Sequence, residues 1–186
     1  MLTGGPWQRR DPRRRHFGKM WIALLLCTFV KLASGDTQNI EFRSCADHPN
    51  AKDAEIKSAV ARDLEVGKTF SIDVAVVFNK EINSDPKLNL TIFTSNKVKI
   101  ACWVSFNAGS CVYKLCNGAT PMEKFLSAAW DSKCPIAAKE YKKTAGLFIP
   151  PIARLVMGDG RLHLRGELIN GGQVVACQEF DVTVKV

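Results

Sequence analysis

Residues 162–186, LHLRGELINGGQVVACQEFDVTVKV, contain two alternating segments on either side of a glycine-rich turn. A period of two places one face of a strand in a core and the other face in water, and Gln178 falls on the apolar face. Asn170-Gly171-Gly172 is typical of a tight hairpin turn. The stretch therefore predicts a β-hairpin whose first strand is broken at Gly166. The apolar positions of the two segments are Leu162, Leu164, Leu168, Val174, Ala176, Phe180, Val182, Val184 and Val186.

Further alternating segments lie upstream. Turn residues separate them, and Asp159-Gly160 favours a second hairpin turn just before residue 162. About six to eight short strands at this spacing indicate an all-β fold, either a sandwich or a barrel. The apolar positions are Phe70, Ile72, Val74, Val76 and Phe78, then Leu88, Leu90 and Ile92, then Val98, Ile100, Cys102 and Val104, with a less regular early segment at Ile56, Val60 and Leu64.

The segment between Cys116 and Cys134 departs from this alternation. Its apolar residues recur at steps of three and four, which predicts a short amphipathic helix. These residues are Met122, Phe125, Leu126, Ala129 and Trp130.

Residues 147–157, LFIPPIARLVM, are unusually apolar for a connection between strands. Pro150-Pro151 is incompatible with a central strand, because proline cannot donate to the ladder. The stretch therefore either packs over the core, as an edge strand would, or forms an exposed apolar patch, which would mark a binding surface. Its large apolar members are Leu147, Phe148, Ile149, Ile152, Leu155, Val156 and Met157.

The N-terminus has the order of a secretory signal peptide, in which basic, apolar and small residues follow one another. Basic residues precede the apolar run WIALLLCTFV at 21–30, and Ala33-Ser34-Gly35 follows it. The run is shorter than the roughly 20 residues that a membrane helix needs. We therefore expect a signal peptide at 1–35, a mature single domain at 36–186, and a secreted or lysosomal protein.

Removal of this leader changes the charge of the chain. The whole chain has a formal net charge of +8, most of which lies in the leader, and the mature chain keeps +2. The polybasic run Arg13–Arg15 therefore belongs to the leader, or to an upstream extension at 1–19 if translation starts at Met20. The mature chain has no basic stripe with interleaved aromatic residues, so we expect no nucleic-acid partner.

Six cysteines remain after the leader is removed. An even number in a secreted chain predicts disulfide bonds, with the pairing left open. Zinc sites use tight CxxC or CxxH pairs, none of which is present, so we expect no metal. Asn89-Leu90-Thr91 is an N-glycosylation sequon, which makes Asn89 a candidate glycosylation site. The cysteines are Cys45, Cys102, Cys111, Cys116, Cys134 and Cys177.

The sequence offers no catalytic motif. The mature chain has two histidines, His48 and His163, and lacks the motifs of nucleophilic hydrolases, zinc proteases, dinucleotide sites and phosphate loops. We therefore expect no enzyme activity, no catalytic residue and no cofactor.

The stretch VKIACWVSFNAGSCVYKLC at 98–116 resembles the ML (lipid-recognition) domain family, and within it the ganglioside activators of the lysosome. The shared frame is a strand ending in cysteine, a short loop, Gly-Ser-Cys, an aromatic residue and a further cysteine. The resemblance extends over about residues 40–186. Its other landmarks are Ser44-Cys45, Cys134-Pro135 followed by Lys139-Glu140-Tyr141, and Cys177.

The resemblance implies an immunoglobulin-like β-sandwich of ML type, whose two antiparallel sheets splay apart to form an apolar cup. The mouth of the cup would carry Met122, Phe125, Leu126 and Trp130, together with the apolar residues of 147–157. The activators have a fourth disulfide within the region corresponding to Cys116–Cys134, which this chain lacks. The implied disulfides are Cys45 with Cys177, Cys102 with Cys111, and Cys116 with Cys134.

The function implied by the resemblance is lipid binding and transfer. Such a protein would touch a membrane surface transiently, extract a glycolipid or phospholipid by its acyl chains, and present it to a lysosomal hydrolase as a non-catalytic activator of a glycosidase. A sterol carrier and a lipid-sensing interaction protein of the innate-immunity type are alternatives within the family. An adhesion sandwich with a filled core is the alternative without a lipid.

Overall fold

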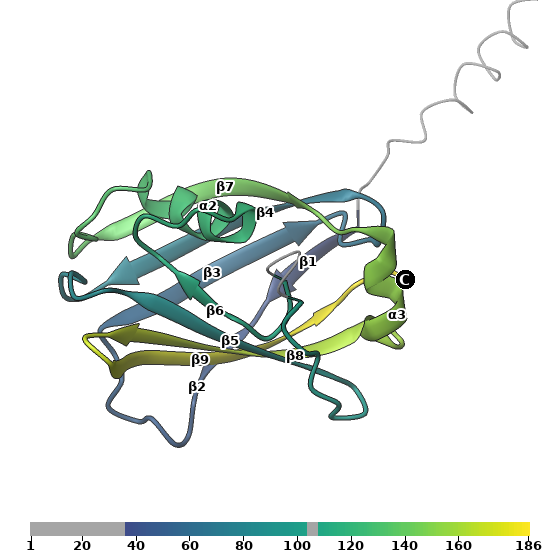
Figure 1. The fold of residues 1–186 in the computed structure, drawn as a ribbon, viewed down its shortest axis with the longest axis horizontal. Coiled ribbons are helices and arrows are strands. Elements are labelled where there is room, and N and C mark those ends of the chain that lie inside the picture. The colour runs from purple at the N-terminus through teal and green to yellow at the C-terminus, as the bar shows by residue number, and fades with distance from the viewer. Residues whose placement is uncertain (1–35, 104–107) are drawn as a thin grey trace, which may run out of the picture. The chain divides into compact units, whose positions relative to one another are not determined.

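Two antiparallel β-sheets face each other in the structure, a computed structural model that describes residues 36–103 and 108–186 (Figure 1). The expected fold class, an immunoglobulin-like β-sandwich, is the one that the structure has. One sheet has the strand order β1-β3-β4-β7, with β1 (Thr37–Ile40), β3 (Ala54–Arg62), β4 (Thr69–Phe78) and β7 (Glu140–Phe148). The other has the order β2-β9-β8-β5-β6, with β2 (Phe42–Ser44), β9 (Gln173–Thr183), β8 (Arg161–Asn170), β5 (Lys87–Thr94) and β6 (Val112–Lys114).

The expected signal peptide at 1–35 and the alternative start at Met20 lie outside the described residues. Within the part of the chain that is described, no helix is both long enough and apolar enough to cross a membrane.

The C-terminal hairpin is confirmed. β8 pairs with β9 along its whole length, and Gly171 and Gly172 make the turn with φ angles of 59° and 79°. Glycine adopts such angles without steric cost. The expected break at Gly166 is wrong, because β8 is continuous there, with Gly166 opposite Gln178 on one side and Leu90 on the other.

Residues 98–104 do not form the expected ladder strand. Ile100 donates its backbone N–H to the carbonyl of Ile92 (2.9 Å), but the described part of the segment forms isolated bridges and single hydrogen bonds and no continuous ladder. β6 occupies another part of the same β5 edge. The two segments therefore share the hydrogen-bonding groups of one strand, which leaves too few for a regular ladder along 98–104. Val104 itself lies outside the described residues.

Asp159-Gly160 does not form a hairpin turn. It connects β8 to the short helix α3 (Arg154–Met157), which follows the 3-10 helix η3 (Pro151–Ala153). β7 is an edge strand and ends shortly before Pro150-Pro151, whose missing N–H groups stop the ladder. The apolar stretch at 147–157 thus combines the end of an edge strand with two helical turns.

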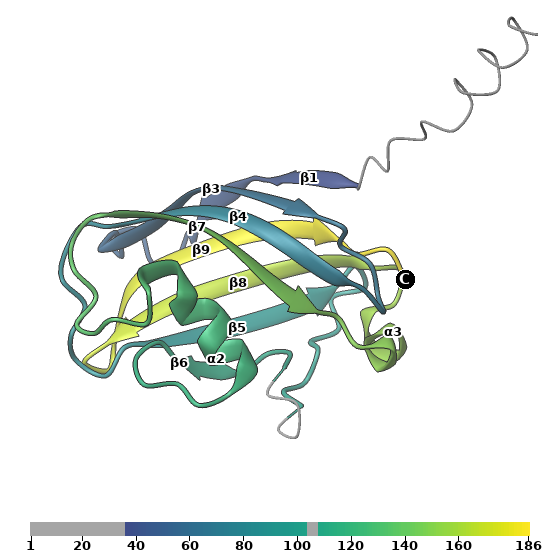
Figure 2. The ribbon, with the colours of Figure 1, turned by 90° about the horizontal axis from the view of Figure 1, so that it is seen from above.

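The predicted amphipathic helix is present as α2 (Pro121–Ser127), which continues as the 3-10 helix η2 (Ala128–Trp130). The Thr120 hydroxyl accepts a hydrogen bond from the Glu123 N–H (3.3 Å), and the Glu123 carboxylate accepts one from the Thr120 N–H (3.0 Å). This capping box fixes the residue at which the helix begins. α2 contacts β6 of one sheet and β7 of the other, and lies between them in Figure 2.

One polar side chain ties the two sheets together. The Gln178 side chain on β9 accepts a hydrogen bond from the Ile56 N–H on β3 (2.7 Å) and donates one to the Ile56 carbonyl (3.3 Å). This side-chain bridge holds β9 against β3, so the sheets are joined on that side of the sandwich.

Three disulfides pair the six cysteines in the way that the resemblance implies. The first joins the loop after β2 to β9, across a sequence separation of 132 residues. The third joins the two ends of the segment that contains α2. The pairs are Cys45–Cys177, Cys102–Cys111 and Cys116–Cys134.

Candidate functional site

A cavity of about 490 Å³ lies between the two sheets. Its walls are the inward faces of β3, β4, β5, β7, β8 and β9, closed on one side by α2, and they are almost wholly apolar. A concave apolar space of this size is typical of a small-molecule site. The strand residues that line it include Phe70, Ile72, Val74, Leu90, Ile92, Leu164 and Phe180.

Several of the inward residues around this cavity are only half-buried. Val74 on β4, and Leu90 and Ile92 on β5, keep part of their surface accessible although they face the interior. In a close-packed core, neighbouring side chains would cover such residues completely. The buried apolar residues form two separate clusters, and Leu162 of one and Phe78 of the other both line the cavity. The interior of the sandwich is therefore hollow rather than filled.

Gly166 makes the cavity larger. It lies on the inward face of β8 and lines the cavity. A Cβ atom at this position would be 3.5 Å from the Leu88 Cδ1 and 4.0 Å from the Gln178 carbonyl oxygen, which are ordinary contact distances. The missing side chain therefore widens the cavity and is not needed to avoid a clash.

α2 and η2 form one wall of the cavity. Met122, Phe125, Leu126 and Trp130 all line it, and Phe125 packs edge-on against Phe70 of β4 with ring centroids 6.0 Å apart. This wall brings together the helical residues that the sequence singled out.

Trp130 does not lie at the mouth of the cavity, where we expected it. Its side chain is 6% exposed and belongs to a packed core cluster, where the ring stands edge-on to Phe78 at 5.8 Å. The indole N–H is buried and has no hydrogen-bond partner among the residues that the structure describes. A buried donor without an acceptor costs free energy, so packing is what holds Trp130 in place.

The 147–157 segment is divided between the cavity and the solvent. Ile152 and Leu155 do not line the cavity, and their exposed fractions are 45% and 78%. Phe148, in contrast, lines the cavity and is also 52% exposed to solvent. The segment thus leads from the cavity wall to exposed apolar side chains, which commonly mark binding surfaces. The cavity-lining members are Leu147, Phe148, Ile149, Val156 and Met157.

Polar residues at the cavity are few, namely Glu55, Lys143 and Gln178. The Gln178 amide is already bonded to the β3 backbone, and the Lys143 ammonium pairs with Asp131 at 2.5 Å. In the described part of the chain, no group of three or more His, Cys, Asp or Glu residues could hold a metal ion. The chemistry that this arrangement offers is the binding of an apolar molecule.

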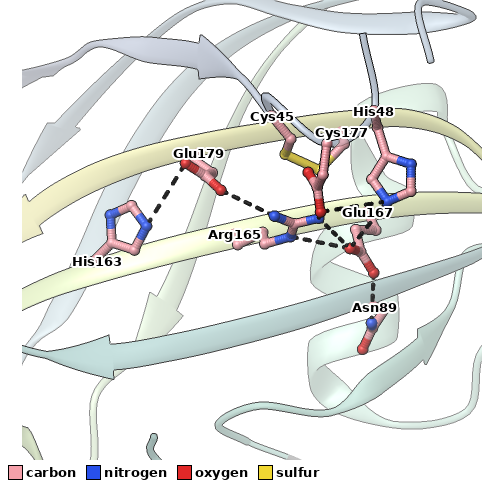
Figure 3. The surroundings of a disulfide bond; sticks show 9 residues. Cys45, His48, Asn89, His163, Arg165, Glu167, Cys177 and Glu179 are labelled. Atoms are coloured by element: carbon pink, nitrogen blue, oxygen red, sulfur yellow. Dashed lines mark hydrogen bonds and ion pairs between the residues drawn. A yellow bond between two sulfur atoms is a disulfide. The ribbon is translucent and has the colours of Figure 1, made fainter. Parts of the chain in front are cut away.

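The outer face of the second sheet carries a charged network (Figure 3). Arg165 on β8 forms ion pairs with Asp47 (2.7 Å), Glu167 (2.8 Å) and Glu179 (3.2 Å). The hydrogen bond to Asp47, and after it the hydrogen bond to Glu167, raise the pKa of Arg165 above its usual value, against the effect of burial. Asp47 belongs to the loop that contains Cys45, so the network fastens the disulfide-bearing loop to the sheet.

Asn89 lies beside this network, on β5, and is half-buried. Its Nδ2 donates a hydrogen bond to the Glu167 carboxylate at 2.8 Å. A glycosylated asparagine keeps one N–H, so a glycan and this hydrogen bond are compatible. Glycosylation of Asn89 stays a prediction, and a glycan there would project from the face that is turned away from the cavity.

The residue pattern alone identified much of the cavity wall but not the cavity itself. Alternation identified the inward residues of the strands, but it does not distinguish a filled interior from a hollow one. Gln178, a polar residue on an apolar face, was the one available clue that the two sheets are bridged. Nothing in the pattern around Lys143 pointed to the cavity, because β7 carries polar residues on both faces.

Two solved structures are distantly similar to this chain. No family model matches the chain, and no curated protein matches it. A solved Niemann-Pick type C2 protein from the Japanese carpenter ant is 12% identical, with 81% of this chain and 92% of that chain covered and a TM-score of 0.41. The C-terminal domain of wzt is 9% identical, with 79% and 78% covered and a TM-score of 0.39. These similarities are too weak to indicate a function, so the function is inferred from the cavity.

Proposed function

We propose that this protein is a non-catalytic lipid-binding protein that holds acyl chains in the cavity between its two sheets. The observation that carries the proposal is the hollow and almost wholly apolar interior. Each CH₂ group transferred from water into such a space contributes about 0.8 kcal/mol. A long chain would therefore be retained without any covalent or catalytic group, while the polar outer faces of the sheets keep the complex dissolved.

We further propose that the lipid is exchanged with a membrane. Phe148 borders the cavity and is exposed, and the exposed Ile152 and Leu155 follow it closely in the chain. Apolar side chains at the edge of a cavity gain free energy by entering a bilayer surface, which would bring the cavity to the lipid. The proposed setting is extracellular or lysosomal, with a glycolipid or phospholipid as cargo and a hydrolase such as a glycosidase as its recipient.

Lipid extraction tests the proposal. Protein purified from the medium of expressing cells is extracted with organic solvent, and mass spectrometry identifies any lipid that co-purified. The delipidated protein is then mixed with phosphatidylcholine vesicles and re-isolated by gel filtration. We expect lipid in both samples, and the absence of lipid from both would overturn the proposal. The recipient is tested separately, since failure to stimulate a glycosidase on vesicle-bound glycolipid would remove the activator role and leave lipid carriage intact.

A further inference from the structure

Lys143 is a charged residue in the wall of an apolar cavity. It lies on β7 between Tyr141 and Ala145, which also face inward, and it lines the cavity. At the same time 40% of its side chain is exposed. A side chain that borders a cavity and also reaches water marks a place where the cavity opens. The stem of Lys143 therefore belongs to the apolar wall and its ammonium group to the rim.

Around Lys143, the one lysine among the described residues that lines the cavity, positive charge exceeds negative charge. Lys143 pairs with Asp131 at 2.5 Å. Lys133 and Lys139 also act on Asp131, and the three ammonium groups, Lys143 most strongly, hold the pKa of that carboxyl below its usual range. Lys139 stands over the Tyr141 ring, 4.7 Å from its centroid. Neither Lys133 nor Lys139 has an ion-pair partner within residues 36–103 and 108–186, so three lysines face one carboxylate.

We propose that this lysine rim (Lys133, Lys139 and Lys143) binds the anionic, phosphate-bearing head group of a lipid whose chains occupy the cavity. The inference rests on the proposed function and adds the charge of the head group. Lysine binds phosphate as a point charge. The neighbouring Glu140 is paired with Lys142 at 3.2 Å, so it does not neutralise the rim.

An ion pair within the described residues accounts for only one of these lysines, since Lys139 has the Tyr141 ring as its partner and Lys133 has no ion-pair partner there. The Lys143–Asp131 pair joins the turn after η2 to β7, and so helps to hold α2 against the first sheet. That contact needs neither Lys133 nor Lys139. Clustered charge of one sign beside a binding cavity attracts a ligand of the opposite sign. A head group with a net negative charge would satisfy this excess, whereas a zwitterionic head group would bring its own cation to the rim.

A competition between two phospholipids in the same vesicle tests the proposal. The vesicles contain equal amounts of phosphatidylglycerol and phosphatidylcholine with identical acyl chains, and mass spectrometry quantifies both lipids on the re-isolated protein. Because both lipids lie in one bilayer, attraction of the protein to a charged surface affects them equally. We expect the wild-type protein to be enriched in phosphatidylglycerol. Lys139→Gln/Lys143→Gln should lower that enrichment about fivefold, the size expected for two partly exposed ion pairs.

Lys133→Gln leaves the Lys143–Asp131 pair in place and should lower the enrichment about twofold. Lys185→Gln is the matched control, because Lys185 is 67% exposed, lies 3.8 Å from Glu65 and does not line the cavity. It should keep the wild-type ratio. Equal loading of the two lipids by the wild-type protein, or an unchanged ratio in the lysine variants, would overturn the head-group proposal and leave lipid carriage standing. Uptake of neither lipid by the wild-type protein would instead remove the proposed function.

Discussion

At the scale of single residues, Gly166 gives the most direct test of the hollow interior. Gly166→Phe would project a ring into the cavity, since a Cβ atom there contacts its nearest neighbours at 3.5 Å or more. Displacing two CH₂ groups of a bound chain costs roughly 1.6 kcal/mol. We therefore expect vesicle lipid uptake to fall about tenfold.

Gly166→Ala is the matched control for this variant, because it adds the Cβ without the ring. It should take up lipid like the wild type. It should also raise the free energy of unfolding by roughly 0.5–1 kcal/mol, because glycine within a strand is less stable than alanine by that amount. Urea unfolding and vesicle uptake are measured on both variants. If Gly166→Phe carried as much lipid as Gly166→Ala, the cavity would not be the lipid site.

Phe148 and Trp130 should respond differently to the same substitution. Phe148 is 52% exposed at the edge of the cavity, so Phe148→Asp should keep the fold and lower vesicle uptake, because the new charge resists desolvation against a bilayer. Trp130 is 6% exposed and packs against Phe78, so Trp130→Asp should cost more than about 3 kcal/mol of stability. Thermal melting followed by circular dichroism, together with vesicle uptake, separates the two. Wild-type uptake by Phe148→Asp would contradict its place at the mouth.

At the scale of elements, the sequence predicted the strands that have a mostly apolar inward face. β4, β5, β8 and β9 were identified in this way, and α2 was identified by its helical spacing. β7 was missed because Lys143 interrupts its inward face and its other polar residues give no alternation. β1 and β2 are four and three residues long, so they are too short for an alternation of apolar and polar residues to be recognised. The error at 98–104 has a different cause, because alternation reports which side chains face inward and not whether backbone partners are free.

Glu123 is the residue that fixes α2 to its neighbours, and its ionisation should control part of the acid stability. Hydrogen bonds from the backbone N–H groups of Lys114 and then Thr120 are the main reasons that the pKa of Glu123 is lowered to about 2, from an ordinary value of 4.5. The ionised carboxylate therefore stabilises the fold fully above about pH 4.5, and this contribution is lost as the pH falls through about 2. It amounts to roughly 3 kcal/mol at most.

Glu123→Gln keeps the shape of the side chain and removes its charge. Urea unfolding of the variant should give a lower free energy near neutral pH and a smaller loss between about pH 4.5 and pH 2 than the wild type shows. Other carboxylates with lowered pKa values, such as Asp47 and Asp181, contribute to both profiles. The difference between the two profiles therefore isolates Glu123. Parallel profiles would mean that these hydrogen bonds do not depend on the charge.

At the scale of the whole molecule, the separation of the two sheets is what the alternation of residues could not predict. Alternation indicates which residues point inward, and a filled and a hollow sandwich share that pattern. The separation depends on contacts between distant parts of the chain. Gln178 ties β9 to β3 on one side, and α2 stands between β6 and β7 on the other. Such pairings cannot be read from a local period, so the residue pattern alone did not predict the cavity, and only the family resemblance led us to expect one.

The long-range disulfide should matter most to this arrangement. On the loop-entropy model, Cys45–Cys177, with a sequence separation of 132, contributes about 5 kcal/mol, whereas Cys102–Cys111, with a separation of 9, contributes about 3 kcal/mol. Replacing each pair with alanine and measuring urea unfolding without reductant should reproduce that order. Because Cys177 adjoins Gln178 and both line the cavity, loss of the first pair should also loosen the bridge between the sheets. Vesicle uptake should then fall further than in the second variant, and equal losses in both would mean that the bond does not set the sheet separation.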